Sequence, residues 1–191
     1  MPGNFLVGSP ASAICRRDIG FRSSHRCPTF HKERAGYHAA QMASKRPDWD
    51  EYFMGFAEAA SHRATCDRKH VGAVIVVNQQ VVATGYNGSV RGLPHCDEAG
   101  HDMEDGHCVR TIHAEMNAIA QAARRGVAVD GSSIYTTASP CWACFRVLVN
   151  AGIRRFVYGE AYREGDAKAR IDEVARKDGL EVKAFEKAAG T

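Results

Sequence analysis

Hydrophobic and polar positions follow regular periods from residue 48 onward. The stretch "DWDEYFMGFAEAASHRA" has a helical repeat, and Asp48 is suited to cap the helix that it predicts. One face of this helix carries Trp49, Tyr52, Phe53, Phe56 and Ala60. Two short apolar runs follow, over 71–77 and 81–86, and the three polar residues between them predict a β-hairpin.

The second half of the chain alternates helical and strand patterns. The segment "HAEMNAIAQAARRG" predicts a helix that ends at Gly126, and a second helix is expected with Ser139 as its N-cap, Pro140 at its first position and Gly152 just past its end. Strands are expected at 132–138, 154–159 and 181–185, and a further helix near 166–178. This order predicts an α/β/α sandwich around a mixed sheet of about five strands.

A polar stretch from Asn87 to Ile112 interrupts the regular pattern. It is rich in His, Cys, Asp and Gly. A loop of this length inside a compact domain is usually functional.

Composition excludes two classes of protein. The chain has 191 residues, of which 45% are hydrophobic and 25% charged, as in an ordinary globular protein with one domain. No apolar run approaches the roughly 18 to 20 residues that cross a bilayer, so we expect no membrane span. The net charge of +3 comes from residues 1–41, which hold six basic and two acidic residues, whereas the rest holds 19 basic and 20 acidic residues. Without a basic excess, a nucleic-acid partner is not expected.

Residues 1–41 have no helical or strand period, and we interpret them as a disordered or non-native N-terminal extension. A transit peptide is the alternative, but we favour a start at Met42, with residues 42–191 as the catalytic domain. The seven cysteines do not resemble a disulfide framework. They predict reduced thiols or metal ligands in the cytoplasm.

The stretch "SPCWAC" holds two cysteines at a spacing shared by redox dithiols, structural zinc clamps and catalytic zinc sites. Cys141 and Cys144 lie on one side of a first helical turn, and His113 begins the other helix, so the three side chains can share one ion. Zinc held by one imidazole and two thiolates keeps a fourth position for water, which is typical of a catalytic site.

Glu115 distinguishes these alternatives. It lies two residues from His113, where a carboxylate can move protons without binding the ion. A redox dithiol or a closed structural zinc would have no use for it. The pattern His-x-Glu followed by Pro-Cys-x-x-Cys is the signature of zinc-dependent deaminases, which favours the catalytic interpretation.

Six segments carry a closer resemblance, over roughly residues 46–165: "RPDWDEYFM", "TCDRKHVGAVIV", "TGYNGSVRGLPHCDE", "HCVRTIHAEMNAI", "YTTASPCWAC" and "NAGIRRFVYGE". In this order they resemble the deoxycytidylate (dCMP) deaminase family, and above all its bacterial branch, whose members include competence-operon proteins. The resemblance implies a cytidine deaminase-like fold and hydrolysis of dCMP to dUMP and ammonia.

The same resemblance implies roles for single residues. His113, Cys141 and Cys144 match the zinc ligands, and Glu115 matches the proton shuttle. The positions that hold the substrate are matched by the backbone of Ala114 and Ser139 for the base, by Arg124 for the phosphate and by Asn87 for the sugar or an effector nucleotide. Asn87 can equally be a turn residue beside Gly88.

A second, structural zinc is implied in some family members. The preferred ligands here are Cys66, Cys96, His101 and Cys108, with His107 able to replace a neighbour; free cysteines in a polar loop are the alternative. Family members are commonly hexamers that dCTP activates and dTTP inhibits. The rival functions are deamination of another cytosine nucleoside or nucleotide, or of a base in a nucleic acid, and a non-catalytic zinc module in competence.

Overall fold

A five-stranded mixed sheet forms the centre of the domain in the computed structural model, which describes residues 46–161 and 166–186. The strand order is β2-β1-β7-β8-β9, with β1 antiparallel to β2 and β7, and β7, β8 and β9 parallel. The strands are β1 (Gly72–Val77), β2 (Gln80–Tyr86), β7 (Ser133–Ala138), β8 (Arg155–Glu160) and β9 (Glu181–Ala184). The predicted extension over residues 1–41 lies outside the described residues.

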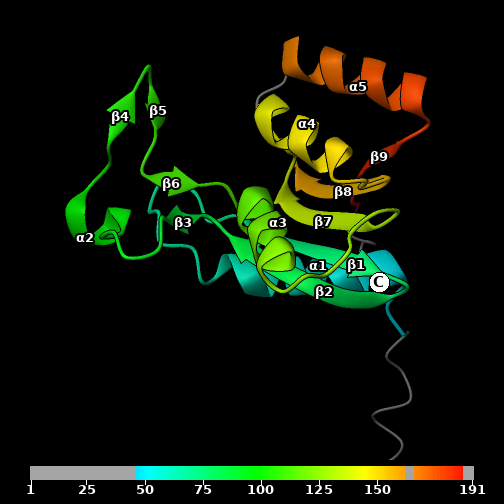
Figure 1. The fold of residues 1–191 in the computed structure, drawn as a ribbon, viewed down its shortest axis with the longest axis horizontal. Coiled ribbons are helices and arrows are strands. Elements are labelled where there is room, and N and C mark those ends of the chain that lie inside the picture. Colours follow the sequence, from blue (N-terminus) through cyan, green and yellow to red (C-terminus); the bar gives the residue numbers. More distant parts are fainter. Residues whose placement is uncertain (1–45, 162–165, 187–191) are drawn as a thin grey trace, which may run out of the picture. The chain divides into compact units, whose positions relative to one another are not determined.

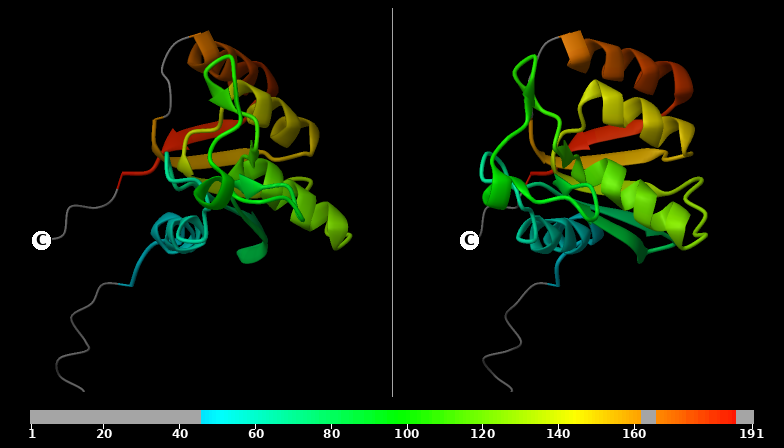
Figure 2. Two further views of the ribbon diagram at one scale, coloured as in Figure 1. Left: turned by 90° about the vertical axis from the view of Figure 1, so that its left-hand side faces the viewer. Right: turned by 60° about the vertical axis from the view of Figure 1, so that its left-hand side comes forward.

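Helices cover both faces of this sheet, as Figures 1 and 2 show. Helix α1 (Trp49–Ser61) packs on one face, and α3 (Ala114–Arg124), α4 (Trp142–Asn150) and α5 (Asp166–Asp178) lie on the other. Successive side chains of a strand point to opposite faces. Val74 and Val76 of β1 accordingly pack with α1, whereas Ala73 and Ile75 join the core under α3 and α4. The predicted α/β/α sandwich is confirmed.

The hairpin between β1 and β2 is tighter than the sequence predicts. Strand β2 begins at Gln80, and Asn78 and Gln79 take positive φ values of 48° and 62°. Two consecutive left-handed residues are typical of the two-residue hairpin turn whose twist matches that of its strands.

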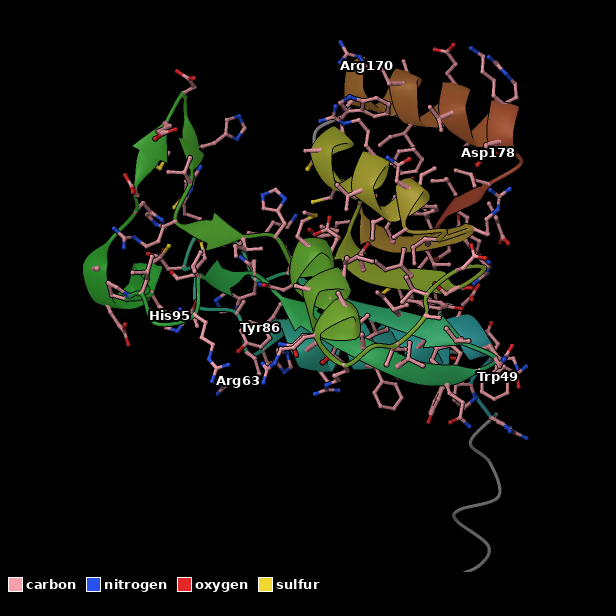
Figure 3. The ribbon with its side chains drawn as sticks, viewed as in Figure 1. Trp49, Arg63, Tyr86, His95, Arg170 and Asp178 are labelled. Carbon is pink, nitrogen blue, oxygen red and sulfur yellow. The ribbon has the colours of Figure 1, made fainter. Side chains whose placement is uncertain are left out.

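Helix α1 turns a different face to the sheet from the one that its aromatic residues predict. Its buried side chains are Phe53, Met54, Ala57 and Ser61. Trp49 and Tyr52 are each 46% exposed and Phe56 is 41% exposed. Figure 3 shows Trp49 at the start of α1 and Arg63 just past its end. Asp48 caps the helix as predicted, since its carboxylate accepts a hydrogen bond of 2.8 Å from the Glu51 amide.

Helix α4 begins two residues later than predicted. Its N-cap is Cys141 and not Ser139, because the Cys141 sulfur accepts a hydrogen bond from the Cys144 amide. Phe145 and Leu148 are fully buried in the core. Gly152, just past the helix, has a φ of 92°, in agreement with the predicted end.

The long polar stretch forms an arm beside the sheet (Figure 1). Helix α2 (Cys96–Ala99) follows the first strand of a short pair formed by β3 (Gly88–Ser89) and β6 (Thr111–Ile112). A second pair, β4 (Met103–Glu104) and β5 (His107–Cys108), forms a hairpin between α2 and β6 in the chain. None of the helices in the described ranges is long and apolar enough to span a membrane.

Candidate active site

Two helix N-termini bring three metal-binding side chains together. His113 is the N-cap of α3, Cys141 is the N-cap of α4, and Cys144 lies in the first turn of α4. The Nδ1 atom of His113 lies 3.4 Å from the Cys144 sulfur and 3.6 Å from the Cys141 sulfur. The three ligand atoms all lie within 4.8 Å of one another. Residues that are far apart in the sequence thus meet at one point.

These distances fit a zinc ion. Zinc binds imidazole nitrogen at about 2.0 Å and thiolate sulfur at about 2.3 Å, so tetrahedral geometry separates a nitrogen from a sulfur ligand by about 3.6 Å. The distances of 3.4 and 3.6 Å from His113 to the two sulfurs agree with this value. Three protein ligands leave a fourth position open, which is characteristic of catalytic zinc.

The thiols differ in their protonation. Hydrogen bonds from the Cys144 thiol, the His113 ring and the Cys144 amide lower the pKa of Cys141 to about 3. The Cys141 thiolate and burial together raise the pKa of Cys144. The same thiolate raises the pKa of His113. A dication bound at this cluster would favour the thiolate form of both cysteines.

Glu115 is a buried carboxyl group beside this cluster. It lies in the first turn of α3 and is only 4% exposed. Burial raises the pKa of Glu115 to about 6. A carboxyl group with a pKa near neutrality can both accept and donate a proton at physiological pH, as a general acid and base requires.

Close packing of α3 on β2 positions His113 and Glu115. A Cβ atom on Gly85 of β2 would lie 2.1 Å from the carbonyl oxygen of Ala114, so only glycine allows this approach. The Asn117 side chain also donates a 2.8 Å hydrogen bond to the Tyr86 carbonyl. Sequence reasoning did not single out Gly85 or Asn117, because the contacts that they make join two separate elements.

A pocket of about 320 Å³ opens onto the cluster, a volume typical of small-molecule sites. Its lining includes His113, Glu115 and Cys141, and also Asn87, Ala114 and Ser139, which were expected to bind the substrate. Three basic residues that sequence reasoning did not assign to the site, Arg68, Lys69 and His107, line it as well. The sequence feature that could have indicated Arg68 and Lys69 is their position just before the apolar run that predicts a buried strand.

Asn87 is 6% exposed, and its side chain forms hydrogen bonds with the backbone of the segment before β1. Its Oδ1 atom accepts a 2.8 Å hydrogen bond from the Val71 amide, and its Nδ2 atom donates one of 2.8 Å to the Lys69 carbonyl. These contacts give Asn87 a structural role at the wall of the pocket. A contact with the sugar or with an effector stays a prediction.

Arg124 lies away from this pocket. It is exposed in the last turn of α3, ten residues after Ala114, which corresponds to roughly 15 Å along the helix axis. It is not among the residues that line the pocket. Phosphate recognition by Arg124 therefore stays a prediction without a contact that supports it in the described chain.

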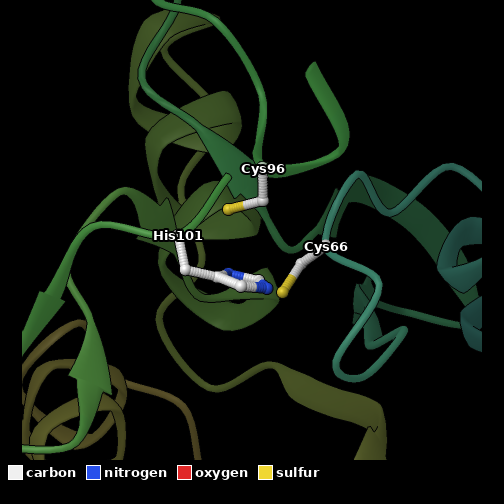
Figure 4. A group of neighbouring side chains, drawn as sticks. All are labelled: Cys66, Cys96 and His101. Atoms are coloured by element: carbon white, nitrogen blue, oxygen red, sulfur yellow. The ribbon is translucent and has the colours of Figure 1, made fainter. Parts of the chain in front are cut away.

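A second group of metal-binding side chains lies at the base of the arm. Figure 4 shows Cys66, Cys96 and His101 pointing toward one another, and their ligand atoms lie within 4.8 Å of one another. The Cys108 sulfur is 3.7 Å from that of Cys96, close to the spacing of about 3.8 Å between two thiolates on tetrahedral zinc. The structure thus places near one another the four residues expected to form a second zinc site.

The surroundings of His101 also fit a metal. Its Nε2 atom lies 2.8 Å from a carboxylate oxygen of Asp67, whereas its Nδ1 atom is buried without a hydrogen-bond partner. A metal-binding histidine typically gives its other ring nitrogen to a carboxylate in this way. Burial opposes ionisation of Cys108, but the neighbouring His101 ring and hydrogen bonds from backbone amides lower the pKa of Cys108 to about 6, which favours the thiolate.

An α/β/α sandwich that gathers an imidazole, two thiols and a buried carboxyl group beside a pocket has the architecture of a zinc-dependent deaminase domain. The sequence model of the family described as "Cytidine and deoxycytidylate deaminase zinc-binding region" matches residues 47–160. The chain belongs to this family, a zinc-binding one.

Relatives agree with this assignment. The chain is 46% identical over 119 residues to ComE operon protein 2 of Bacillus subtilis (strain 168). This alignment covers 62% of this chain and 63% of that protein. It is 40% identical over 125 residues to the deoxycytidylate deaminase of Mycobacterium phage D29. That alignment covers 59% of this chain and 95% of the phage protein. The match thus spans less than two thirds of the first relative and nearly all of the second.

A solved structure also resembles the domain. The dCMP deaminase of the cyanophage S-TIM5, in complex with dCMP and dUMP, matches with a TM-score of 0.62 and 32% identity. The match covers 74% of this chain and 100% of that one. The resemblance to the dCMP deaminase family, with its branch of competence-operon proteins, is confirmed.

Proposed function

We propose that this chain catalyses the zinc-dependent hydrolytic deamination of dCMP to dUMP and ammonia in pyrimidine deoxynucleotide metabolism. The observation that carries the proposal is the buried carboxyl group of Glu115 beside the His113, Cys141 and Cys144 cluster. A site that only binds zinc would not require a buried carboxyl group with a raised pKa. The phage relatives named deoxycytidylate or dCMP deaminase support the choice of substrate.

Each residue has a definite role in this proposal. His113, Cys141 and Cys144 hold the ion, and the N-termini of α3 and α4 favour the thiolate form of the two cysteines. When bound, zinc lowers the pKa of a water molecule toward about 7 and so makes it a nucleophile at neutral pH. Backbone groups of Ala114 and Ser139, both at the pocket wall, orient the cytosine ring.

Glu115 carries the protons. In its ionised form it accepts a proton from the attacking water, which adds to C4 of the cytosine ring. It then delivers this proton to N3 and passes the proton of the new C4 hydroxyl to the amine, so that the C4–N bond breaks, ammonia leaves and C4 becomes a carbonyl. A pKa of about 6 for Glu115 suits both halves of this exchange.

The test of this proposal is ammonia release from dCMP, dCTP, cytidine and deoxycytidine by the purified protein. We expect the highest kcat/KM with dCMP. The substitution Glu115→Gln should lower kcat at least about 10²-fold while zinc content stays the same. Glu58→Gln, on the exposed side of α1, is the matched control and should retain full activity. Full activity in Glu115→Gln would disprove the assigned role.

Two alternatives remain as outcomes of the same assay. A higher kcat/KM with cytidine or deoxycytidine would make the chain a deaminase of another cytosine compound. Ammonia release from none of the four would favour a non-catalytic zinc module, such as one that acts in competence.

The second cluster supports a structural zinc in this proposal. Cys66, Cys96, His101 and Cys108 form a set of three thiols and one imidazole, which closes the coordination sphere and leaves no position for water. Such an ion would hold the arm against the segment before β1. Zinc at both clusters requires reduced thiols, which fits the cytoplasm as the location.

The remaining parts of the proposal concern the whole chain. We propose that residues 42–191 form the catalytic domain and that residues 1–41 are an extension. Assembly into a homo-oligomer such as a hexamer, with activation by dCTP and inhibition by dTTP, stays a prediction from the family resemblance. The exposed aromatic side chains of α1, Trp49, Tyr52 and Phe56, offer a surface for assembly.

A further inference from the structure

The pocket carries an unusual distribution of charge. Among the residues that the structure describes, Glu115 is the only carboxylate that lines it, and this residue lies beside the metal-binding cluster. Arg68, Lys69 and His107 also line the pocket, but they come from other elements than the helices that hold the cluster. Arg68 and Lys69 thus place two cations at the pocket beyond the reactive group, which suits a substrate with an anionic tail.

Arg68 and Lys69 can accept such an anion at low cost. Lys69 lies 3.0 Å from a carboxylate oxygen of Glu160, but the Glu160 side chain is 78% exposed, and exposed pairs of this kind contribute little. Arg68 is exposed, and its Nη1 atom donates to the sulfur of Met103 at 3.5 Å, a weak acceptor. A phosphate dianion would be a much stronger partner for both side chains.

The segment that carries these two cations is anchored downstream by Asn87. Besides its two side-chain hydrogen bonds to Lys69 and Val71, the Asn87 amide donates to the Val71 carbonyl at 3.1 Å. The Thr65 amide in turn donates to the Asn87 carbonyl at 3.2 Å. Asn87 therefore acts as a positioning residue for the segment from Thr65 to Val71.

The upstream anchor is the second cluster. Cys66 is buried among its ligand atoms, and Asp67 contacts the His101 ring. Cys66 and Asp67 thus contact the second cluster, and the next two residues, Arg68 and Lys69, line the pocket. Anchors on both sides restrict the main chain that presents the two cations, which reduces the entropy lost when they bind a ligand.

We propose that Arg68 and Lys69 recognise the 5′-phosphate of the substrate and so set the preference for a nucleoside monophosphate over a nucleoside. This inference rests on the proposed function, because it requires the cytosine ring to be bound at the His113 cluster. It assigns to the segment before β1 a task that the family resemblance suggested for Arg124. The two assignments predict different variants to lose phosphate recognition.

The experiment compares kcat/KM for dCMP with kcat/KM for deoxycytidine in each variant. Arg68→Ala and Lys69→Met should each lower the ratio of the two values about 10-fold, and the double variant about 100-fold, since each removes a hydrogen bond to a charged group. Arg68→Lys keeps the charge and should lose less than Arg68→Ala. Arg63→Ala removes an exposed arginine outside the pocket, and should leave the ratio unchanged.

Calorimetry of dUMP binding to the zinc-loaded protein provides a second measurement that does not depend on turnover. The double variant should bind dUMP about 100-fold more weakly, and zinc content and thermal unfolding should confirm that it is folded. An unchanged ratio and unchanged dUMP affinity in the double variant would overturn the inference, and so would a loss confined to Arg124→Ala. If the wild-type protein deaminates none of the cytosine compounds, the proposed function fails, and the calorimetric result still decides whether Arg68 and Lys69 bind the phosphate.

Discussion

At the scale of single residues, the chemistry of the site depends on burial as much as on residue type. Glu115 and Glu58 have the same side chain, yet only Glu115 is buried, and burial raises the pKa of Glu115 to about 6. The sequence motif indicates which carboxyl group is the candidate proton shuttle. Burial brings the pKa of this group close to neutral pH, where it can both accept and donate a proton.

Asp67 is a residue whose importance only its contact with His101 reveals. Asp67→Asn should weaken zinc binding at the second cluster about 10- to 100-fold, because it removes the carboxylate that contacts the ring of the predicted ligand His101. The measurement is the zinc-to-protein ratio during titration with a competing chelator. Asp97→Asn, an exposed substitution in the neighbouring helix α2, should leave that ratio unchanged. Equal zinc loss in both variants would show that general charge matters rather than this contact.

At the scale of elements, two close approaches of helix to strand hold the sandwich together. A Cβ atom on Gly72 would lie 2.0 Å from the Ala57 carbonyl oxygen of α1, and one on Gly85 would lie 2.1 Å from the Ala114 carbonyl oxygen of α3. Because both clashes are with backbone atoms, a side chain at either glycine would force a helix to move. At Gly85 the displaced helix is the one that carries His113 and Glu115.

Gly85→Ala should therefore damage stability and activity together. We expect a loss of at least about 1–3 kcal/mol in the free energy of unfolding, as for overpacking of a tight core, and a fall in kcat larger than in KM. Denaturant unfolding and steady-state kinetics measure the two effects. The matched control is Gly55→Ala in α1, where nothing lies within 4 Å and the helix should gain about 0.5–1 kcal/mol. Wild-type kinetics in Gly85→Ala would contradict the proposed packing constraint.

A network of charges ties α1 to three strands. Both carboxylate oxygens of Asp50 accept hydrogen bonds from the Arg155 guanidinium, at 2.8 and 2.9 Å, and Tyr135 and Lys183 also contact this carboxylate. Arg155 additionally pairs with Glu181 of β9. The Arg155 guanidinium, followed by Lys183 and Tyr135, holds the pKa of Asp50 well below its usual range.

Asp50→Asn should lower the free energy of unfolding by about 1.5–3 kcal/mol at pH 7, because it removes a charge-assisted pair that is only partly exposed. The exposed pair of Lys168 and Asp172 is the control, and Asp172→Asn should cost less than about 0.5 kcal/mol. Denaturant unfolding across a pH series provides the measurement.

The pH dependence of this difference has a definite sign. Since the folded-state pKa of Asp50 is lowered, its contribution is fully present above the unfolded-state pKa of about 3.9 and is lost as the pH falls below that value. The difference between wild type and Asp50→Asn should therefore be constant from pH 7 to 5 and shrink at lower pH. A difference that vanished already at pH 5 would exclude the assigned cause.

At the scale of the whole molecule, two clusters of side chains that could hold a metal ion lie within one domain. We expect two zinc ions per chain by elemental analysis. Removal of both with a strong chelator should lower the midpoint of thermal unfolding, because a closed structural site contributes its binding energy to folding. Cys96→Ser should reduce the content to one zinc per chain while Cys144→Ser removes the other ion. One zinc per chain in the wild-type protein would rule out the second site.

Much of the fold follows from local patterns. Strands β7, β8 and β9 and helix α5 lie within one residue of their predicted positions, because each is a single continuous segment of the chain. The zinc motif could be recognised for a related reason, since His113 with Glu115, and Cys141 with Cys144, are each held at a helix start by neighbours in the sequence.

Other features depend on contacts between distant segments. Helix α1 has two adjacent apolar stripes, and its period alone does not say which one is buried. The small side chain of Ala57 and the glycine at position 72 allow the closest approach to the sheet, so Phe53 and Met54 pack inward while Trp49, Tyr52 and Phe56 remain exposed. Close packing of the interior therefore outweighs the hydrophobicity of the larger aromatic side chains.

The residue types and their spacing along the chain thus identified the α/β/α sandwich and the zinc-dependent deaminase family, and predicted which three side chains meet in the first cluster, since those properties reside in short segments. Tertiary structure decided the buried face of α1, the partner of His101 and the presence of Arg68 and Lys69 at the pocket. Each of these depends on distances between atoms that are remote in the sequence, and such distances exist only once the sheet has brought its helices and the arm together.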